Sequence, residues 1–388
     1  MNTESRLMKR IWFAFKYFYR LFFIYLFRVF PIKTNKIVFT SFYGKFCNDI
    51  PRAIFDELEK DERIECVWIV NDKQVGTGIK VKKAKINSIK HIYHLSTARV
   101  WIDNSRKPLW TRKRKRQFYI QTWHGGLALK KVEKDAIDSL NKSYIKMAKN
   151  DSNMADLFLS ETRVRTKNYL SAFWYSGDIL TGRFLRNEKL DKDIKKNFYS
   201  DYHIDKDRKI VLYAPTFRND YNESVFVFDF KKILLALERK FESKYLLCIK
   251  LHPNLSSHIL NLKTCDSNVV DVTKYDDMQS LIKITDILIT DFSGCMFDAF
   301  RNEKKVFLFA KDYEQYITNN RDLYLNITDL PSSFAKSETD LYTNIQNFDS
   351  KSYFSKVALF NERIGYYNND GLKGCVEIIY GVLGIKNG

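Results

Sequence analysis

Side chains suited to phosphate chemistry recur in four short segments, each placed where an apolar stretch stops. These segments are Gln121–Gly126 (QTWHGG), Tyr213–Arg218 (YAPTFR), Lys250–Pro253 (KLHP) and Thr290–Asp298 (TDFSGCMFD). In the first segment His124 is followed by Gly125 and Gly126, and glycines let a backbone approach a ligand closely. Because an imidazole titrates near neutral pH, His124 can take a proton from a hydroxyl. A purely structural histidine is the alternative.

Two further segments place cations at predicted strand ends. Thr216 and Arg218 follow an apolar run, and a guanidinium at that position can hold a phosphate through two hydrogen bonds. Lys250 and His252 end the next predicted strand in the same way. An ordinary surface arginine and a histidine already satisfied by its neighbours are the alternatives.

The fourth segment joins a predicted strand to a predicted helix through Asp291, Ser293 and Gly294. Backbone N–H groups at the start of a helix point away from its body, and they favour a negative charge. We therefore expect this segment to bind an anion. The alternative is that Ser293 only caps its own helix.

The elements that must position these segments alternate between apolar runs of strand length and helical patterns. Such alternation is typical of right-handed βαβ units and a parallel sheet, which bind ligands at the carboxyl ends of the strands. We predict an α/β fold of two Rossmann-like domains with a central cleft. The predicted strands are 36–42, 64–70, 100–103, 118–122, 157–160, 178–181, 210–214, 245–251, 269–272, 287–290 and 306–309. Predicted helices follow Asn48, cover 86–95, end at Phe173, cover 230–241, begin at Met278 and Ser293, and cover 337–347 and 371–382.

A polar stretch rich in lysine and aspartate interrupts this alternation between 187 and 208, and we interpret it as a linker. The predicted divisions are an amino-terminal segment 1–32, a first domain 33–187, the linker 188–208 and a second domain 209–388. Two D-x-D pairs, Asp191/Asp193 and Asp205/Asp207, lie within this linker and away from any strand end. We therefore expect no metal and no cofactor.

The amino-terminal segment Leu7–Ile32 is rich in aromatic residues and is interrupted by Lys9, Arg10, Lys16, Arg20 and Arg28. Its uncharged runs are too short for a spanning helix, which needs about 20 apolar residues. With most basic residues on one side of a helix, the pattern predicts an amphipathic helix that lies on an anionic membrane surface. A spanning helix and a helix packed on its own domain are the alternatives.

Composition indicates a globular protein whose partners are anionic. The 388 residues are 45% hydrophobic and 29% charged, and the formal net charge is +19. Six cysteines without C-x-x-C spacing are typical of reduced, buried thiols, which favours a cytoplasmic location. The basic run Arg106–Arg116 favours an anionic lipid or a lipid diphosphate over nucleic acid, because no nucleic-acid-binding signature accompanies it.

Taken together and in this order, the four segments resemble the W-H-(G/A), Y-A-P-T-x-R, L-H-P and T-D-(Y/F)-S-x-x-(M/F)-D motifs of the CDP-glycerol glycerophosphotransferases of bacterial teichoic-acid and capsule assembly. The resemblance extends from about Lys36 to the end of the chain. Gly294 departs from the family, which often has a second serine there. The spacing from Gly125 to Lys130 and the short chain match the branch that adds a single unit.

This resemblance implies a glycosyltransferase B fold with an acceptor-binding first domain and a CDP-binding second domain. It implies that His124 is the base and that His252 lies near the diphosphate. The donor site would be lined by Thr216, Arg218, Lys250, Asp291, Ser293 and Gly294, and the acceptor side by Gly125, Gly126 and Lys130.

The function so implied is transfer of glycerol phosphate from CDP-glycerol to a hydroxyl of a lipid-linked acceptor, with release of CMP. The enzyme would be peripheral and would work at the cytoplasmic face of the cell membrane. The alternatives are a ribitol phosphate transferase that uses CDP-ribitol, a glycosyltransferase that uses a nucleotide-sugar and, more remotely, a basic nucleic-acid-binding protein.

Overall fold

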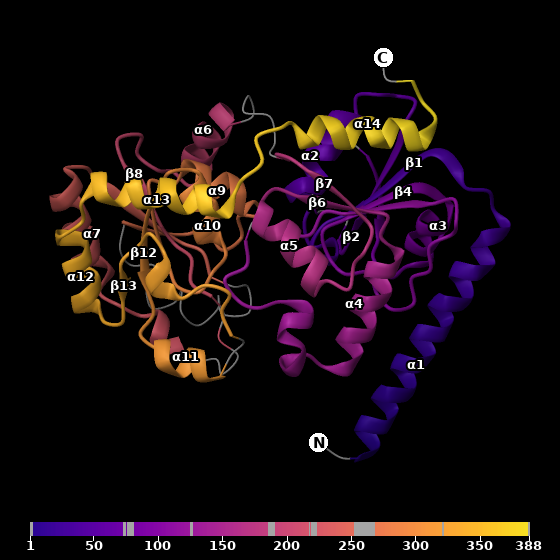
Figure 1. Cartoon of the computed structure of the whole chain (residues 1–388), viewed down its shortest axis with the longest axis horizontal. Coiled ribbons are helices and arrows are strands. Elements are labelled where there is room, and N and C mark those ends of the chain that lie inside the picture. Colours follow the sequence, from indigo (N-terminus) through magenta and orange to yellow (C-terminus); the bar gives the residue numbers. More distant parts are fainter. Residues whose placement is uncertain are drawn as a thin grey trace. The chain divides into compact units, whose positions relative to one another are not determined.

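The computed structural model describes residues 3–72, 75, 81–124, 127–184, 191–216, 218, 223–251, 268–319 and 322–386. The chain forms two compact units, and it passes between them more than once (Figure 1). The first unit comprises Met1–His124, Leu140–Arg186 and Tyr367–Gly388, and the second comprises Gly125–Ser139 and Asn187–Tyr366. Each unit is built on its own parallel sheet, which confirms the predicted α/β class.

The sheet of the first unit has seven parallel strands in the order β3-β2-β1-β4-β5-β6-β7. The strands are β1 (Lys33–Thr40), β2 (Glu65–Val70), β3 (Lys82–Lys85), β4 (Ala98–Asp103), β5 (Phe118–Gln121), β6 (Leu157–Ser160) and β7 (Asp178–Thr181). The strand order reverses between β1 and β4. In open α/β sheets such a switch point is where ligands bind, outside the carboxyl ends of the strands.

Helices cover both faces of this sheet. They are α1 (Thr3–Leu26), α2 (Asp49–Leu58), α3 (Ile89–Thr97), α4 (Lys142–Met154), α5 (Arg163–Ala172) and α14 (Gly371–Leu383). One face packs against α2 and α14, with Ile54 and Ile379 buried in the same apolar cluster as Phe39 of β1. The opposite face packs against α3 and the end of α1, through Ile92 and Ile24.

The carboxyl-terminal helix α14 belongs to the first unit, whereas the sequence placed all of 209–388 in the second domain. Its buried side chains Cys375, Ile379 and Leu383 complete the apolar cluster beneath α2. At the start of α14, Gly371 lies so near Gly182 that a Cβ on Gly182 would come within 2.4 Å of the Gly371 Cα. Helix α14 therefore belongs to the first unit because its apolar face packs there, although it follows the second unit in the sequence.

The sheet of the second unit has six parallel strands in the order β10-β9-β8-β11-β12-β13. The strands are β8 (Lys209–Tyr213), β9 (Tyr245–Ile249), β10 (Val269–Asp271), β11 (Ile287–Thr290), β12 (Lys305–Phe309) and β13 (Phe334–Ala335). The switch point of this sheet lies between β8 and β11. The segments that follow these two strands contain Thr216, Arg218, Asp291 and Ser293, so the fold brings these predicted donor residues to one switch point.

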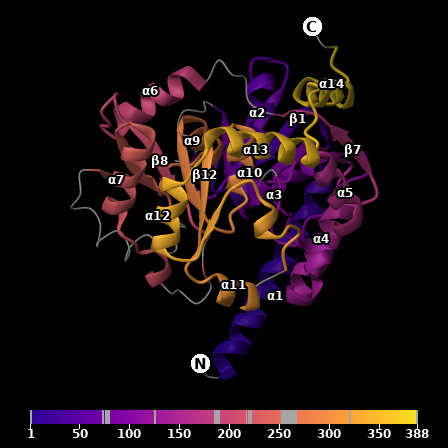
Figure 2. The same cartoon turned by 60° about the vertical axis from the view of Figure 1, so that its left-hand side comes forward.

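The helices of the second unit are α6 (Asp191–Asp201), α7 (Phe230–Phe241), α9 (Met278–Ile284), α10 (Cys295–Arg301), α11 (Tyr313–Asn319), α12 (Glu338–Gln346) and α13 (Ser350–Ile364). Figure 2 brings this unit forward, with α7 and α12 side by side over the cluster that contains Leu237 and Leu341. The stretch 188–208 was expected to be a linker. Instead the structure forms α6 there, because Phe198, Tyr199 and Ile204 are buried although lysines and aspartates surround them.

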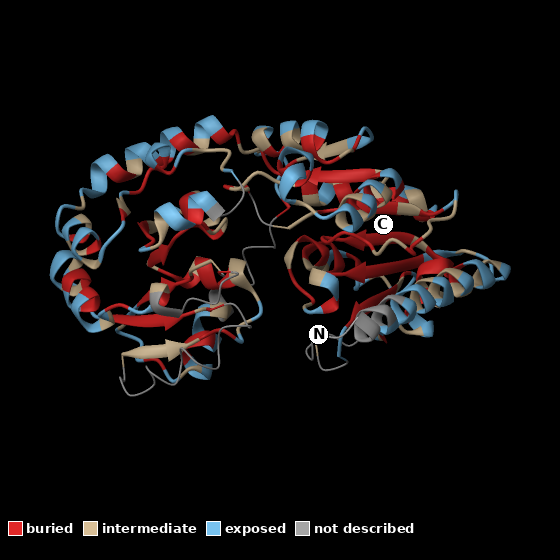
Figure 3. Ribbon diagram, turned by 90° about the horizontal axis from the view of Figure 1, so that it is seen from below, coloured by how far each residue is buried: buried red, intermediate tan, exposed pale blue. Residues whose placement is uncertain are grey.

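Helix α1 is attached to the first unit by one side only. Tyr17, Leu21 and Ile24 pack toward α3, and Arg20 is half-buried, with a pKa lowered by desolvation. Along the outer side, an apolar row made of Met8, Ile11, Phe15, Phe18, Phe22 and Leu26 stays exposed (Figure 3). Among the residues that the structure describes, no helix is both long and apolar enough to cross a membrane.

Candidate functional site

His124 lies just beyond β5, next to the switch point of the first sheet. Its Nδ1 atom lies 2.6 Å from the backbone carbonyl oxygen of Asn104, which follows β4. A carbonyl oxygen can only accept a hydrogen bond, so this contact assigns the proton to Nδ1 and leaves the lone pair on Nε2. That is the tautomer needed by a base that takes a proton through Nε2.

Aromatic rings fix the plane of the His124 imidazole. Trp123 stacks on it with ring centroids 4.7 Å apart, and Phe42, from the loop after β1, lies 5.3 Å away. Trp123 itself has a positive φ of 55°, which is uncommon for a bulky residue. Its backbone N–H donates to Gln121 Oε1 at 2.9 Å, which ties the turn back to the end of β5.

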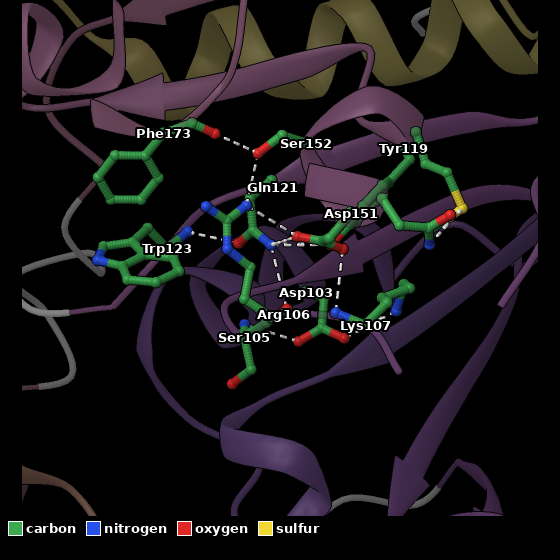
Figure 4. A network of polar contacts seen from close by, with 12 residues as sticks. Asp103, Ser105, Arg106, Lys107, Tyr119, Gln121, Trp123, Asp151, Ser152 and Phe173 are labelled. Carbon is green, nitrogen blue, oxygen red and sulfur yellow. Dashed lines mark hydrogen bonds and ion pairs between the residues drawn. The ribbon is translucent and has the colours of Figure 1, made fainter. Parts of the chain in front are cut away.

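A buried polar network lies beside this turn (Figure 4). The guanidinium of Arg106 pairs with Asp151 at 3.1 Å and donates to Ser152 Oγ at 2.8 Å. It also lies 5.1 Å from the ring centroids of both Trp123 and Phe173. Further bonds to Asp151 come from the Lys107 backbone N–H, the Tyr119 hydroxyl and the Gln121 amide.

The sequence predicted that the basic run Arg106–Arg116 would meet an anionic lipid, but most of its cations are not exposed. Arg106 and Lys107 are buried, and Lys107 Nζ pairs with Asp103 at 2.7 Å. Arg112 donates to the Tyr17 hydroxyl and Arg114 to the Phe30 carbonyl, so both hold the amino-terminal segment on the domain. The exposed cations of the run are Lys115 and Arg116. This burial leaves little of the run for nucleic acid.

In the second unit, Asp291 joins the two segments at the switch point. Its Oδ1 accepts hydrogen bonds from the backbone N–H groups of Thr216 at 2.8 Å and Phe292 at 2.6 Å. Its Oδ2 accepts from Arg218 Nη2 at 2.8 Å. Both carboxylate oxygens of Asp291 therefore bind groups of the protein itself, and they hold the segments after β8 and β11 together.

Arg218 is held between two carboxylates. Four of its five N–H groups are engaged: Nε and Nη2 donate to Asp312, Nη2 also donates to Asp291, and Nη1 donates to the Thr216 carbonyl. Burial alone would lower the pKa of Arg218, but its bonds and charge contacts with Asp312 and Asp291 raise it above the ordinary value. The sequence predicted an arginine exposed to phosphate. The structure shows one that mainly clamps the segments after β8, β11 and β12.

Thr216 has a buried hydroxyl at this switch point. Its Oγ1 is buried and has no hydrogen-bond partner among the described residues. Such an atom is costly to bury unless something else pairs with it. A phosphate or ribose oxygen would satisfy it.

Ser293 and Gly294 begin the turn into α10. The Ser293 hydroxyl accepts a long hydrogen bond, 3.4 Å, from the Cys295 backbone N–H, as the capping alternative describes. A Cβ on Gly294 would lie 3.1 Å from the Leu127 carbonyl oxygen, so any larger residue there would push against the chain at Leu127. The close approach of Leu127 accounts for the missing side chain at this position.

Lys250 follows β9, and its ammonium donates to the carbonyl oxygens of Tyr275 at 2.6 Å and Thr273 at 3.4 Å. Burial lowers the pKa of this lysine. Lys250 thus holds the turn between β10 and α9. His252, and also Gly125 and Gly126, lie outside the described residues.

Lys130 was expected on the acceptor side, but the structure places it in the second unit. Backbone bonds connect its neighbours to a distant segment: Lys131 N–H donates to the Asp322 carbonyl at 2.7 Å, and Tyr324 N–H donates to the Leu129 carbonyl at 2.8 Å. Its ammonium lies 4.8 Å from the centroid of Tyr316, a ring that Arg218 also approaches, at 4.5 Å. Lys130 and Arg218 therefore approach the same ring, in the second unit.

Sequence reasoning missed three polar residues of these sites: Asp49, Asn104 and Asp312. Asn104 and Asp312 follow β4 and β12 closely, so the rule that ligands gather at carboxyl ends of strands could have marked them. Asp49 follows a loop after β1 and offered no such signal.

Comparisons with known proteins agree with this arrangement. The family model "CDP-Glycerol:Poly(glycerophosphate) glycerophosphotransferase" matches residues 21–373. The chain is 30% identical over 357 residues to the teichoic acid poly(glycerol phosphate) polymerase of Staphylococcus epidermidis, covering 87% of this chain and 49% of that protein. It therefore spans about half the length of that relative. It is 28% identical to the Bacillus spizizenii polymerase of the same name, covering 90% of this chain and 93% of the relative.

The chain is also similar to a relative named for ribitol phosphate and to a solved structure. The teichoic acid poly(ribitol-phosphate) polymerase of Bacillus spizizenii is 26% identical, with 89% of this chain and 55% of that protein covered. The structure of the wall teichoic acid polymerase TagF superposes with a TM-score of 0.83 at 27% identity and covers 98% of this chain and 97% of that one. The resemblance predicted from four motifs is thereby confirmed: the chain belongs to the CDP-glycerol:poly(glycerophosphate) glycerophosphotransferase family.

Proposed function

We propose that this protein transfers glycerol phosphate from CDP-glycerol to a hydroxyl of a lipid-linked teichoic-acid acceptor and releases CMP. The observation that carries the proposal is the bond from His124 Nδ1 to the Asn104 carbonyl at a sheet switch point, in a chain of this family. An imidazole held in this tautomer is suited to take a proton from an acceptor hydroxyl.

The proposed step conserves atoms and charge. The acceptor oxygen attacks the β-phosphorus of CDP-glycerol while its proton passes to Nε2 of His124. The bond between the β-phosphorus and the bridging oxygen breaks, and CMP leaves with the electron pair. The product is a phosphodiester between the acceptor and glycerol, and the imidazolium then returns its proton to solvent.

On the donor side we propose two kinds of role. Thr216, Lys130 and the backbone at Ser293 and Gly294 would contact the nucleotide diphosphate, with His252 near the departing CMP. Asp291, Arg218 and Lys250 would mainly hold the surrounding segments, and one Nη1 N–H of Arg218, which has no partner among the described residues, would donate to the ligand. Preorganised donors of this kind stabilise the charge that develops during phosphoryl transfer.

We also propose that the protein works at an anionic membrane surface, where a lipid-linked acceptor resides. The outer row of α1 supplies exposed apolar side chains, and Lys115 and Arg116 supply exposed positive charge next to Arg114, which bonds to Phe30. An apolar helix face beside cations is the combination that binds headgroup and acyl chain together.

The experiment that tests the proposed reaction is CMP release from CDP-glycerol, CDP-ribitol and a panel of UDP-sugars with a synthetic lipid-linked acceptor. We expect release from CDP-glycerol in preference to CDP-ribitol and none from UDP-sugars. Preferred use of CDP-ribitol or of a UDP-sugar would overturn the proposal. Counting the glycerol phosphates on each product distinguishes single addition, which the spacing to Lys130 predicts, from polymerisation.

A further inference from the structure

Two segments at the switch point of the first unit, the connection from β1 to α2 and the end of β4, meet at the side chain of Asn104. Its Nδ2 donates to Asp49 Oδ2 at 2.8 Å and to Ser41 Oγ at 3.3 Å. Its Oδ1 accepts from the Phe42 backbone N–H at 2.7 Å. Asn104 is buried and Asp49 is half-buried, and hydrogen bonds hold both the nitrogen and the oxygen of the Asn104 amide.

The chain around this amide is unusual. Phe42, Tyr43 and Asp49 all have positive φ, at 45°, 56° and 62°. For residues other than glycine, each such conformation costs about 1–3 kcal/mol and persists only where the surroundings enforce it. The bonds to Asn104 are part of that enforcement, because they tie the loop after β1 to the end of β4.

We propose that Asn104, anchored by Asp49, is the positioning residue that fixes the tautomer and direction of the His124 imidazole. The backbone carbonyl of Asn104 receives the Nδ1 proton, and the side chain of the same residue holds that carbonyl in place through the loop after β1. The expected effect on the transfer rate rests on the proposed function, whereas the effect on the His124 tautomer does not.

The groups that face Asp49 are consistent with an anchor. Asn104, just after β4, donates to its carboxyl, while Arg165 and Glu161, from the segment after β6, influence it with opposite charges. Burial raises the pKa of the Asp49 carboxyl to about 6, so it is ionised at neutral pH and accepts the Asn104 amide strongly.

The experiment compares Asn104→Ala and Asp49→Ala with wild type in the full-length protein. Asn104→Ala keeps the backbone carbonyl but loses its anchors. We expect kcat to fall about 10–100-fold while KM for CDP-glycerol is unchanged, because small misplacements of a reacting group cost rate. Asp49→Ala should behave similarly, and Asp49→Asn, which keeps an acceptor oxygen, should recover most of the rate.

A second readout follows the tautomer itself. In protein labelled with 15N-histidine, the His124 signals are assigned by their absence in His124→Gln. We expect the wild type to show a proton on Nδ1 and Asn104→Ala to show a mixture of tautomers. This spectrum needs no substrate. It therefore tests whether Asn104 sets the His124 tautomer even if CDP-glycerol proves not to be the donor.

The matched control is Asn35→Ala, since Asn35 also donates to a backbone carbonyl, that of Arg63, but lies at the amino end of β1. It should leave both kcat and the His124 spectrum unchanged. An unchanged tautomer in both Asn104→Ala and Asp49→Ala would overturn the proposal, and so would a rate loss in Asn35→Ala equal to theirs.

Discussion

Arg218 and Asp291 form an ion pair in which Nη2 and Oδ2 lie 2.8 Å apart, with side-chain exposures of only 5% and 2%. Asp312 also pairs with this guanidinium, so Arg218 neutralises one buried carboxylate, Asp291, and one half-buried carboxylate, Asp312. The three residues come from the segments after β8, β11 and β12. Their pairing holds these three segments together at the switch point of the second sheet.

Replacing Arg218 should therefore cost stability as well as donor affinity. Arg218→Ala leaves the buried Asp291 and the half-buried Asp312 without their partner, and loss of one partner of a buried ion pair typically costs about 3–5 kcal/mol. Denaturant unfolding should show that loss, and calorimetry should show weak CDP-glycerol binding. Arg239→Ala, at an exposed position on α7, serves as the control and should change neither quantity. A stable Arg218→Ala with normal donor affinity would contradict the clamp.

Thr216→Val should separate stability from binding. The Thr216 hydroxyl is buried without a partner among the described residues, so removing it should raise the free energy of unfolding by about 1 kcal/mol. The same change should weaken CDP-glycerol binding, while Thr216→Ser should retain most of the affinity. Unfolding curves and calorimetric titrations on the three proteins measure both effects. Unaltered donor affinity in Thr216→Val would exclude the hydroxyl as a donor contact.

The carboxyl of Asp49 should make the protein less stable as the pH rises. Burial raises the pKa of its carboxyl from 3.8 to about 6, so the folded state binds this proton more tightly than the unfolded state. Its contribution is therefore lost as pH rises from about 4 to 6, and ionised Asp49 costs roughly 3 kcal/mol above that window. Asp49→Asn should be more stable than wild type at pH 8, and the gain should vanish near pH 4.

Asp61 provides the opposite control for that measurement. Its pKa is lowered, chiefly by the hydrogen bond from Arg63, so Asp61→Asn should be less stable than wild type at neutral pH, and this difference should vanish in acid. If the gain in Asp49→Asn were the same at every pH, the Asp49 carboxyl would not have the raised pKa.

The outer row of α1 should govern membrane binding. Phe15, Phe18 and Phe22 are 65%, 64% and 61% exposed, so a triple Phe→Ser variant should keep the free energy of unfolding. Each phenyl ring buried in a bilayer is worth about 2 kcal/mol, so sedimentation with anionic vesicles should be largely lost. Leu359→Ser, at an equally exposed site on α13, is the control. Normal sedimentation of the triple variant would rule out this face.

Much of the fold could be predicted because parallel strands buried on both faces appear as continuous apolar runs. The runs at β6, β7 and β11 were predicted with their observed bounds. Strand β3 (Lys82–Lys85) was missed because it is an edge strand in which only Ala84 is buried. The helices α4, α11 and α13 were also missed.

The site was predicted less completely, since side-chain partners lie far apart in the chain. Nothing near Arg106 indicates that Asp151 will bury it. Likewise, Lys130 follows His124 closely in sequence, yet the segment pairs with residues near 323 and joins the other unit. Motifs at strand ends located the chemistry. Long-range contacts decided which side chains face a ligand and which support it.

The most direct test of the account is single-turnover transfer of glycerol phosphate by His124→Gln, measured alongside its affinity for CDP-glycerol. We expect transfer to slow about 10²–10⁴-fold with unchanged donor affinity, because a general base acts on the acceptor. Transfer at a rate near that of the wild type would contradict the assignment of His124 as the base.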